Sequence, residues 1–100
     1  MARIELAPEV ADDIDRIIVH LTSHGAENIA SRIDEIIQAI SVLELNPLIG
    51  RPAPNDLREL IIGRRSHGYV ALYRYAMEID TVFVLALCGQ REAGYGDRDF

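Results

Sequence analysis

Residues 56–95 read DLRELIIGRRSHGYVALYRYAMEIDTVFVLALCGQREAGY, and this stretch decides the fold. Its apolar residues fall into three short runs, 57–62, 69–75 and 79–88, which are separated by polar or glycine-bounded turns. Runs of this length that are rich in aliphatic and aromatic residues are typical of β-strands. The last run is apolar on both faces, as a central strand would be. The sequence therefore predicts three successive antiparallel strands.

Alternation within the second run predicts which side chains share a face of the sheet. Successive residues of a strand point to opposite faces, so the tyrosines and one alanine of 69–75 are expected together on one side: Tyr69, Ala71, Tyr73 and Tyr75. Exposed tyrosines on this small sheet would leave apolar surface uncovered, which is expected of a protein that lives in a complex.

The residues before this sheet predict helices that cover it. Residues 3–6 alternate like a short strand, and Pro8 then stands at a favourable position for a first helical turn. Apolar residues recur at helical spacing from Val10 to Leu21 and again from Ile29 to Leu43, with helix ends expected near Gly25 and Asn46. Residues 47–55, rich in proline, are expected to form a loop.

The predicted fold is therefore α+β, with the order βααβββ: an antiparallel sheet with an N-terminal helical hairpin packed on one face. A chain of 100 residues is expected to form one domain over 1–100, with 94–100 as a mobile end. There is no apolar run that could span a bilayer and no signal-peptide pattern, so a cytoplasmic protein is expected. A single cysteine, Cys88, fits a reducing compartment.

Charge is distributed unevenly along the chain. Residues 1–46 hold three arginines and nine acidic residues, whereas residues 47–100 hold seven of each. The whole chain has a net charge of −6 and a sequence pI near 4.9. Between Gly50 and Tyr75 there are five arginines and two acidic residues, so an anionic or acidic partner is expected to meet the sheet rather than the helices.

Five segments in order carry a resemblance to a known family. A helical hairpin is followed by NPLIGRP, LREL, YVALYRY and an apolar strand that runs into QREAGY. This succession resembles the ParE branch of the RelE/ParE toxin superfamily of bacterial toxin–antitoxin modules, over nearly the whole chain. The chain departs from similar proteins at Cys88 and Gly89, where they often carry a basic or polar pair, and whether this attenuates toxicity stays open.

The resemblance implies a plasmid- or chromosome-borne toxin that inhibits DNA gyrase by stabilising the cleaved gyrase–DNA complex. It implies neutralisation by a ParD-type antitoxin in a hetero-oligomer, in which the antitoxin wraps the hairpin and sheet. It implies no enzymatic activity, no cofactor, no membrane partner and no sequence-specific nucleic-acid binding by the toxin alone. A non-toxic partner-binding module of the same fold is a further alternative.

The sister branch of RelE-like, ribosome-dependent mRNA endoribonucleases shares the fold and is an alternative function. RNA cleavage at the 2′-hydroxyl needs a base, a cation for the phosphate and an acid for the leaving oxygen. Arg58, Arg74 and Tyr95 could form such a set. A protein that binds RNA is expected to be basic, so the negative net charge favours the interpretation as a gyrase inhibitor.

Two sets of residues are nominated as sites, and no catalytic residue is nominated. The set expected to face gyrase is Arg64, Arg65, Arg91, Glu92 and Tyr95. The set expected to contact the antitoxin is Arg58, Tyr69, Tyr73 and Arg74. Arg58 and Arg74 have structural alternatives, as cross-strand ion-pair and cation–π partners. His20 and His24 lie four residues apart, but no further ligand completes a recognisable metal set, so no metal site is expected.

Overall fold

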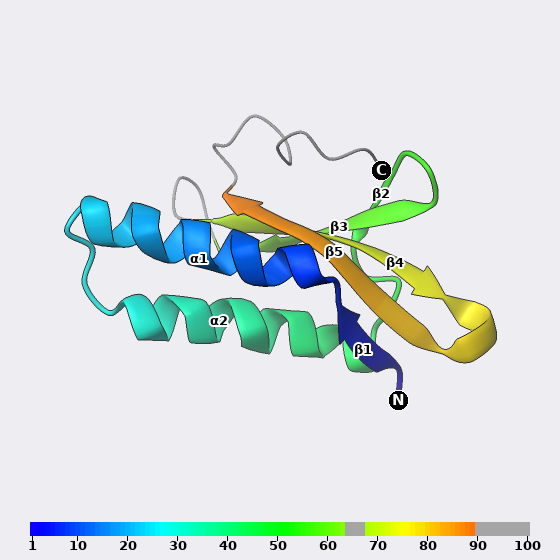
Figure 1. Cartoon of the computed structure of the whole chain (residues 1–100). Helices are drawn as coiled ribbons and strands as arrows, with labels where there is room; N and C mark the ends of the chain where they lie inside the picture. Colours follow the sequence, from blue (N-terminus) through cyan, green and yellow to red (C-terminus); the bar gives the residue numbers. More distant parts are fainter. Residues whose placement is uncertain (64–67, 90–100) are drawn as a thin grey trace.

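The computed structural model describes residues 1–63 and 68–89, which form two helices and a five-stranded sheet (Figure 1). The elements, in chain order, are β1 (Arg3–Leu6), α1 (Pro8–Ser23), α2 (Ile29–Ser41), the 3-10 turn η1 (Val42–Glu44), β2 (Arg51–Ala53), β3 (Leu57–Ile62), β4 (Tyr69–Ala76), the 3-10 turn η3 (Met77–Ile79) and β5 (Thr81–Gly89). The α+β class, the helical hairpin and the three-strand meander are confirmed. The predicted mobile end at 94–100 lies outside the described residues.

The sheet is mixed, with strand order β1-β5-β4-β3-β2. Strands β2 to β5 pair antiparallel, whereas β1 pairs parallel with β5, with Arg3 opposite Thr81 and Leu6 opposite Val84. The prediction of a wholly antiparallel sheet is therefore wrong for β1. β1 occupies the edge of the sheet next to β5, and the chain turns into α1 directly after it.

A short strand also lies in the segment that the sequence predicts as loop. Arg51–Ala53 forms β2 at the edge of the sheet and pairs with β3. Proline cannot donate a backbone hydrogen bond, and a strand that contains it is tolerated at an edge. Pro52 therefore made this segment look like a loop in the sequence, although the strand still forms at the edge of the sheet.

The helices lie side by side against one face of the sheet (Figure 1). Helix α1 begins with Pro8 at its first position and buries Val10, Ile17 and Leu21, as its apolar spacing predicts. Helix α2 begins at Ile29, after Asn28 in a left-handed conformation, and buries Ile36 and Ile40. These residues form the main core together with the helix-facing side of the sheet.

The predicted shared face of β4 is confirmed, and it is the face that meets the helices. Ala71 and Tyr73 are buried in the main core, and Tyr69 and Tyr75 pack against it. A register shift after Leu72 leaves Leu85 as an extra residue on β5, since Leu72 pairs with Ala86 and Tyr73 with Val84. Such a bulge changes which way a strand presents its side chains. Leu85 and Ala86 both join a second apolar cluster, centred on Leu57 and Leu72, on the helix-free face.

Candidate partner-binding site

The loop between η1 and β2 is fixed to the sheet by one tyrosine and one arginine. The hydroxyl of Tyr73 accepts a hydrogen bond of 2.8 Å from the backbone N–H of Gly50. One guanidinium nitrogen of Arg58 donates to the carbonyls of Leu48, at 3.0 Å, and of Gly50, at 2.8 Å. Tyr73 and Arg58 lie opposite each other on β4 and β3, so both reach the loop from the same face of the sheet.

Gly50 is required by how closely the loop approaches the ring beneath it. A Cβ at this position would lie 2.6 Å from the hydroxyl oxygen of Tyr73 and 2.9 Å from the carbonyl oxygen of Glu59. Both distances are shorter than real carbon contacts, so the glycine in NPLIGRP allows the hydrogen bond to form.

Burial sets the protonation state of this tyrosine. The side chain of Tyr73 has no exposed surface, and its desolvation raises the pKa of the phenol above 10.0. The hydrogen bond from Gly50 and the positive charge of Arg58 act in the opposite direction but do not cancel the effect of burial. The phenol is therefore neutral across the physiological range and serves the loop as a hydrogen-bond acceptor.

The fixed loop presents apolar side chains to solvent. Leu45, Leu48 and Ile49 are 75%, 52% and 57% exposed. The loop closes on itself through a bond from the N–H of Ile49 to the carbonyl of Asn46. Exposed apolar side chains that are grouped on one fixed loop are typical of an interaction surface. We call residues 45–50 the tethered loop.

The four residues nominated for antitoxin contact do not form one surface. Tyr73 is buried, so the expectation of an exposed tyrosine is wrong there, and the residue belongs to the core. Tyr69 is half-buried and packs against the same core. Arg58 lies on the helix-facing side, where it is engaged with the tethered loop. Arg74 is exposed on the opposite face, as the cross-strand partner of Phe83.

The five residues nominated for gyrase contact lie outside the described residues. They belong to the β3–β4 connection and to the segment after β5: Arg64, Arg65, Arg91, Glu92 and Tyr95. The structure describes the strands that lead into these segments, and the nomination stays a prediction.

A carboxylate and a guanidinium on α1 hold the backbone of β5, which the sequence analysis missed. Asp13 is 4% exposed and accepts a hydrogen bond of 2.9 Å from the N–H of Leu87, while Arg16 donates to the carbonyl of the same residue at 2.9 Å. The two side chains also pair with each other at 3.3 Å. The signal was available in the sequence, because Asp13 lies in helical phase with the buried residues Val10 and Ile17.

The second tyrosine with a raised pKa, Tyr75, is half-buried and lies near the end of β4. The hydroxyl of Tyr75 donates to a carboxylate oxygen of Asp80 at 2.6 Å. This hydrogen bond, together with desolvation and the negative charge of Asp80, raises the pKa of the phenol. Asp80 has a φ of 46° and ends the η3 turn, so the contact ties the turn to β4.

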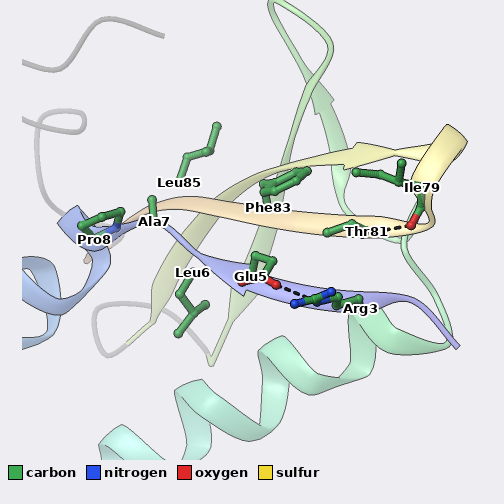
Figure 2. A pocket seen from close by; sticks show the side chains of 9 residues that line it. All are labelled: Arg3, Glu5, Leu6, Ala7, Pro8, Ile79, Thr81, Phe83 and Leu85. Carbon is green, nitrogen blue, oxygen red and sulfur yellow. Dashed lines mark hydrogen bonds and ion pairs between the residues drawn. The ribbon is translucent and has the colours of Figure 1, made fainter.

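An open groove of about 450 Å³ lies along β1 and β5 (Figure 2). Among the residues that line it, Arg3 and Glu5 form an ion pair at 2.6 Å, and the Thr81 hydroxyl donates to the carbonyl of Ile79 at 2.9 Å. Phe83 is on the face opposite the core residues Val82 and Val84, so the groove lies on the helix-free face. The full lining is Arg3, Glu5, Leu6, Ala7, Pro8, Ile79, Thr81, Phe83 and Leu85.

His20, in the last turn of α1, and His24, which caps the helix, lie with their ring centroids 4.2 Å apart in a tilted arrangement. The Nδ1 atom of His24 lies 2.9 Å from the carbonyl oxygen of His20, which it can reach as a helix-ending hydrogen bond. Within residues 1–63 and 68–89, no three or more His, Cys, Asp and Glu residues gather as a metal site would require. In the same part of the chain, neither helix has the length and apolarity to cross a membrane.

A family model described as the ParE toxin of type II toxin–antitoxin systems, parDE, matches residues 4–94. The chain belongs to the ParE toxin family. It is therefore a type II toxin of the RelE/ParE superfamily, as the succession of sequence segments indicates. No curated protein shows significant sequence similarity to it.

Solved structures confirm the fold of this ParE-family chain. A chain of the chromosomal ParDE toxin–antitoxin system from P. aeruginosa is similar, with a TM-score of 0.72 and 22% identity over 89% of this chain and 96% of that chain. A chain of the archaeal RelE–RelB complex from Pyrococcus horikoshii OT3 is more distant, with a TM-score of 0.57 and 13% identity over 92% and 98%. At sequence identities this low, the similarity to these two chains shows a shared fold only.

Proposed function

We propose that this ParE-family toxin inhibits DNA gyrase by stabilising the cleaved gyrase–DNA complex, and that it acts by binding and not by catalysis. The match of the ParE family model over residues 4–94 carries the proposal. The net charge of −6 agrees with a target that is met through protein contacts rather than through broad contact with nucleic-acid phosphates.

The arrangement of arginines gives no support to the RelE-like ribonuclease alternative. Arg58 faces the helices and donates to two loop carbonyls, whereas Arg74 faces the other way from the next strand. Side chains on opposite faces of one sheet cannot converge on one phosphate. The third member of that set, Tyr95, lies outside the described residues.

A ParD-type antitoxin is the proposed neutralising partner, in a toxin–antitoxin hetero-oligomer. The similar P. aeruginosa chain comes from a ParDE system, and the more distant relative was solved as a RelE–RelB complex. Exposed apolar residues support the proposal that a partner covers this chain. Among them, the side chains of Leu45 and Met77 are 75% and 69% exposed.

The deciding experiment combines a gyrase assay with a translation assay on the same preparations. Purified gyrase, plasmid DNA and ATP receive the chain alone, and then the chain with the antitoxin encoded beside it. Loss of supercoiling with accumulation of linear, protein-linked DNA, reversed by the antitoxin, is the expected result. Intact gyrase activity together with mRNA cleavage on ribosomes would refute the proposal in favour of the RelE-like function.

A pair of arginine variants in the C-terminal segment tests the nominated target contacts. Arg91→Ala is expected to weaken gyrase inhibition at least tenfold, because a desolvated charge contact of this kind carries about 1.4 kcal/mol or more. Arg98→Ala is the matched control, since it removes the same charge from the same segment at a position that was not nominated. An equal loss of gyrase inhibition in both variants would show that net charge, and not a specific contact of Arg91, causes the loss.

The free chain is expected to self-associate and to gain stability from the antitoxin. At an antitoxin concentration one hundred times its Kd, the free energy of unfolding should rise by about 2.7 kcal/mol. Sedimentation and thermal unfolding, with and without antitoxin, measure both effects. A monomeric free chain whose Tm does not change with antitoxin would contradict this interpretation of the exposed apolar residues.

A further inference from the structure

The end of helix α1 carries two histidines at a spacing that suits one shared metal ion. His20 and His24 lie four residues apart, which is the spacing that places two side chains on one face of a helix. Both residues are exposed, and their rings already lie close together. Neither ring belongs to the apolar core or contributes to the tethered loop. The pair is therefore open to a ligand from solvent.

The hydrogen bond of His24 determines which of its ring nitrogens carries the proton. Its Nδ1 atom lies 2.9 Å from the carbonyl oxygen of His20. A carbonyl oxygen only accepts, so in the neutral ring Nδ1 donates and Nε2 keeps its lone pair. The hydroxyl of Ser23, 3.1 Å from the same Nδ1, donates its hydrogen to the carbonyl of His20 at 2.9 Å, which agrees with Nδ1 as the donor.

This arrangement matches that of histidines that bind metals in proteins. Such a histidine coordinates the ion with one ring nitrogen and donates its other ring N–H to a carbonyl or a carboxylate, which fixes the orientation of the ring. In His24 the N–H of Nδ1 is already used in this way, and Nε2 is the nitrogen left for an ion.

Backbone hydrogen bonds hold His24 in place although it lies just beyond the last residue of the helix. The N–H of Gly25 donates to the carbonyl of Thr22 at 3.1 Å, and Gly25 has a φ of 67°. The N–H of Ala26 donates to the carbonyl of Leu21 at 3.0 Å. Together these bonds form a Schellman motif, with glycine in the left-handed conformation that the motif favours. The second histidine is therefore positioned by the fold.

The surroundings of the pair favour a positive ion. The carbonyl groups at the C-terminal end of a helix carry a partial negative charge, which stabilises cations there. Residues 1–46, which include both helices, hold nine acidic residues and three arginines. The turn between the helices lies at the end of the molecule remote from the N-terminus (Figure 1), so an ion bound there would not obstruct the tethered loop.

We propose that His20 and His24 together bind one divalent transition-metal ion, with Zn²⁺ as the probe. Each histidine supplies one ring nitrogen, which in His24 is Nε2. Two imidazoles that share a zinc ion at about 2.0–2.1 Å have their ring centres roughly 5 Å apart, so rings with centroids at 4.2 Å need only a small opening. Because no set of three His, Cys, Asp or Glu residues gathers in residues 1–63 and 68–89, water completes the coordination.

The bound ion would tie the last turn of α1 to its cap and so stabilise the corner of the helical hairpin. This inference does not depend on the nature of the toxin's target, and its tests use no activity assay. Zinc binding by a chain that leaves gyrase unaffected would support the metal site and refute only the proposed function.

Isothermal titration calorimetry of the full-length, metal-free chain with Zn²⁺ tests the site. One ion per chain is expected, and His20→Ala and His24→Ala should each weaken the affinity at least tenfold. His67→Ala is the matched control, because it removes the remaining histidine of the chain and should leave the Kd within twofold. No binding up to millimolar Zn²⁺, or an unchanged Kd in both variants of the pair, would overturn the proposal.

NMR of the ring nitrogens in the unaltered, isotope-labelled chain provides a test that needs no variant. Zn²⁺ should shift the Nε2 resonance of His24 and leave a proton on its Nδ1. Signals of both rings that stay unchanged at saturating Zn²⁺ would refute the site, and so would coordination through Nδ1. If an alanine variant is less folded than the unaltered chain by circular dichroism, these resonances decide the question.

Thermal unfolding tests whether the ion stabilises the fold. At a Zn²⁺ concentration ten times the Kd, the Tm of the unaltered chain and of His67→Ala should rise by at least about 4 °C. The Tm of His24→Ala should stay within about 1 °C at the same concentration, because the second ligand is missing. An equal rise in all three proteins would show that zinc binds elsewhere and would contradict the proposal.

Discussion

Replacing Tyr73 by phenylalanine tests whether one buried hydroxyl holds the tethered loop. The ring would stay in the core, but the N–H of Gly50 would lose its acceptor at a buried site. A buried donor left without a partner costs about 1–3 kcal/mol. Phenylalanine avoids burying a hydroxyl, which offsets part of this cost, so we expect a net loss of about 1–2 kcal/mol in the free energy of unfolding.

Urea denaturation followed by circular dichroism measures this loss. For a domain of about 100 residues, 1 kcal/mol corresponds to a change of about 4–8 °C in Tm, so thermal unfolding provides an independent value. The urea dependence should keep the same slope, since the surface exposed on unfolding is unchanged. Full stability in Tyr73→Phe would refute the role assigned to the hydroxyl.

The pH dependence of the same variant gives a second test. Burial raises the pKa of Tyr73 in the folded chain above its unfolded value of 10.0. Above about pH 10 the unfolded chain therefore loses this proton first, and the stability that the neutral phenol contributes below pH 10 is lost as pH rises through the folded pKa. Tyr73→Phe should show a shallower alkaline decline in stability, and an identical decline would contradict the assignment.

Three further substitutions test the contacts around the sheet. Asp13→Ala removes the acceptor for a backbone N–H of β5 and should cost about 1–3 kcal/mol in urea denaturation, whereas Asp15→Ala, on the exposed side of the same helix, should stay within about 0.5 kcal/mol of the unaltered chain. Gly50→Ala forces a methyl group against the phenol oxygen beneath it and should cost about 1–3 kcal/mol by overpacking, measured in the same way. Asp80→Asn weakens the hydrogen bond that the Tyr75 hydroxyl donates and removes the charge that disfavours its phenolate, so an NMR titration should find the pKa of that phenol lowered toward 10.0, and an unchanged pKa would contradict the contact.

Local patterns in the sequence predict the helices and the meander, because each element shows its own periodicity. The stripe from Val10 to Leu21 and the shared face from Tyr69 to Tyr75 both appear as predicted. The direction of β1 could not be predicted in this way. Pairing between residues 3–6 and 81–84 is set by a neighbour almost eighty residues away, and four alternating residues carry no information on parallel or antiparallel pairing.

The candidate site was predicted less well, since residue type does not reveal which face or depth a side chain takes. Tyr73 was correctly placed on one face with Tyr69, but that face is the core and not the surface. Arg58 was weighed as a cross-strand partner and is engaged by loop carbonyls instead. Asp13 was not singled out, although its helical phase buries it against β5.

The side chains of Tyr73, Arg58 and Asp13 all form hydrogen bonds with backbone groups of this chain. Tyr73 and Arg58 are used on the helix-facing side to hold the tethered loop, and Asp13 fixes β5 just before the chain enters the C-terminal segment. None of the three is free to meet a partner without releasing a backbone group. A substitution at any of them should therefore affect partner binding only as far as it moves a loop or a strand. Binding that is lost while the fold stays unaltered should instead map to exposed positions, such as Leu48 on the tethered loop.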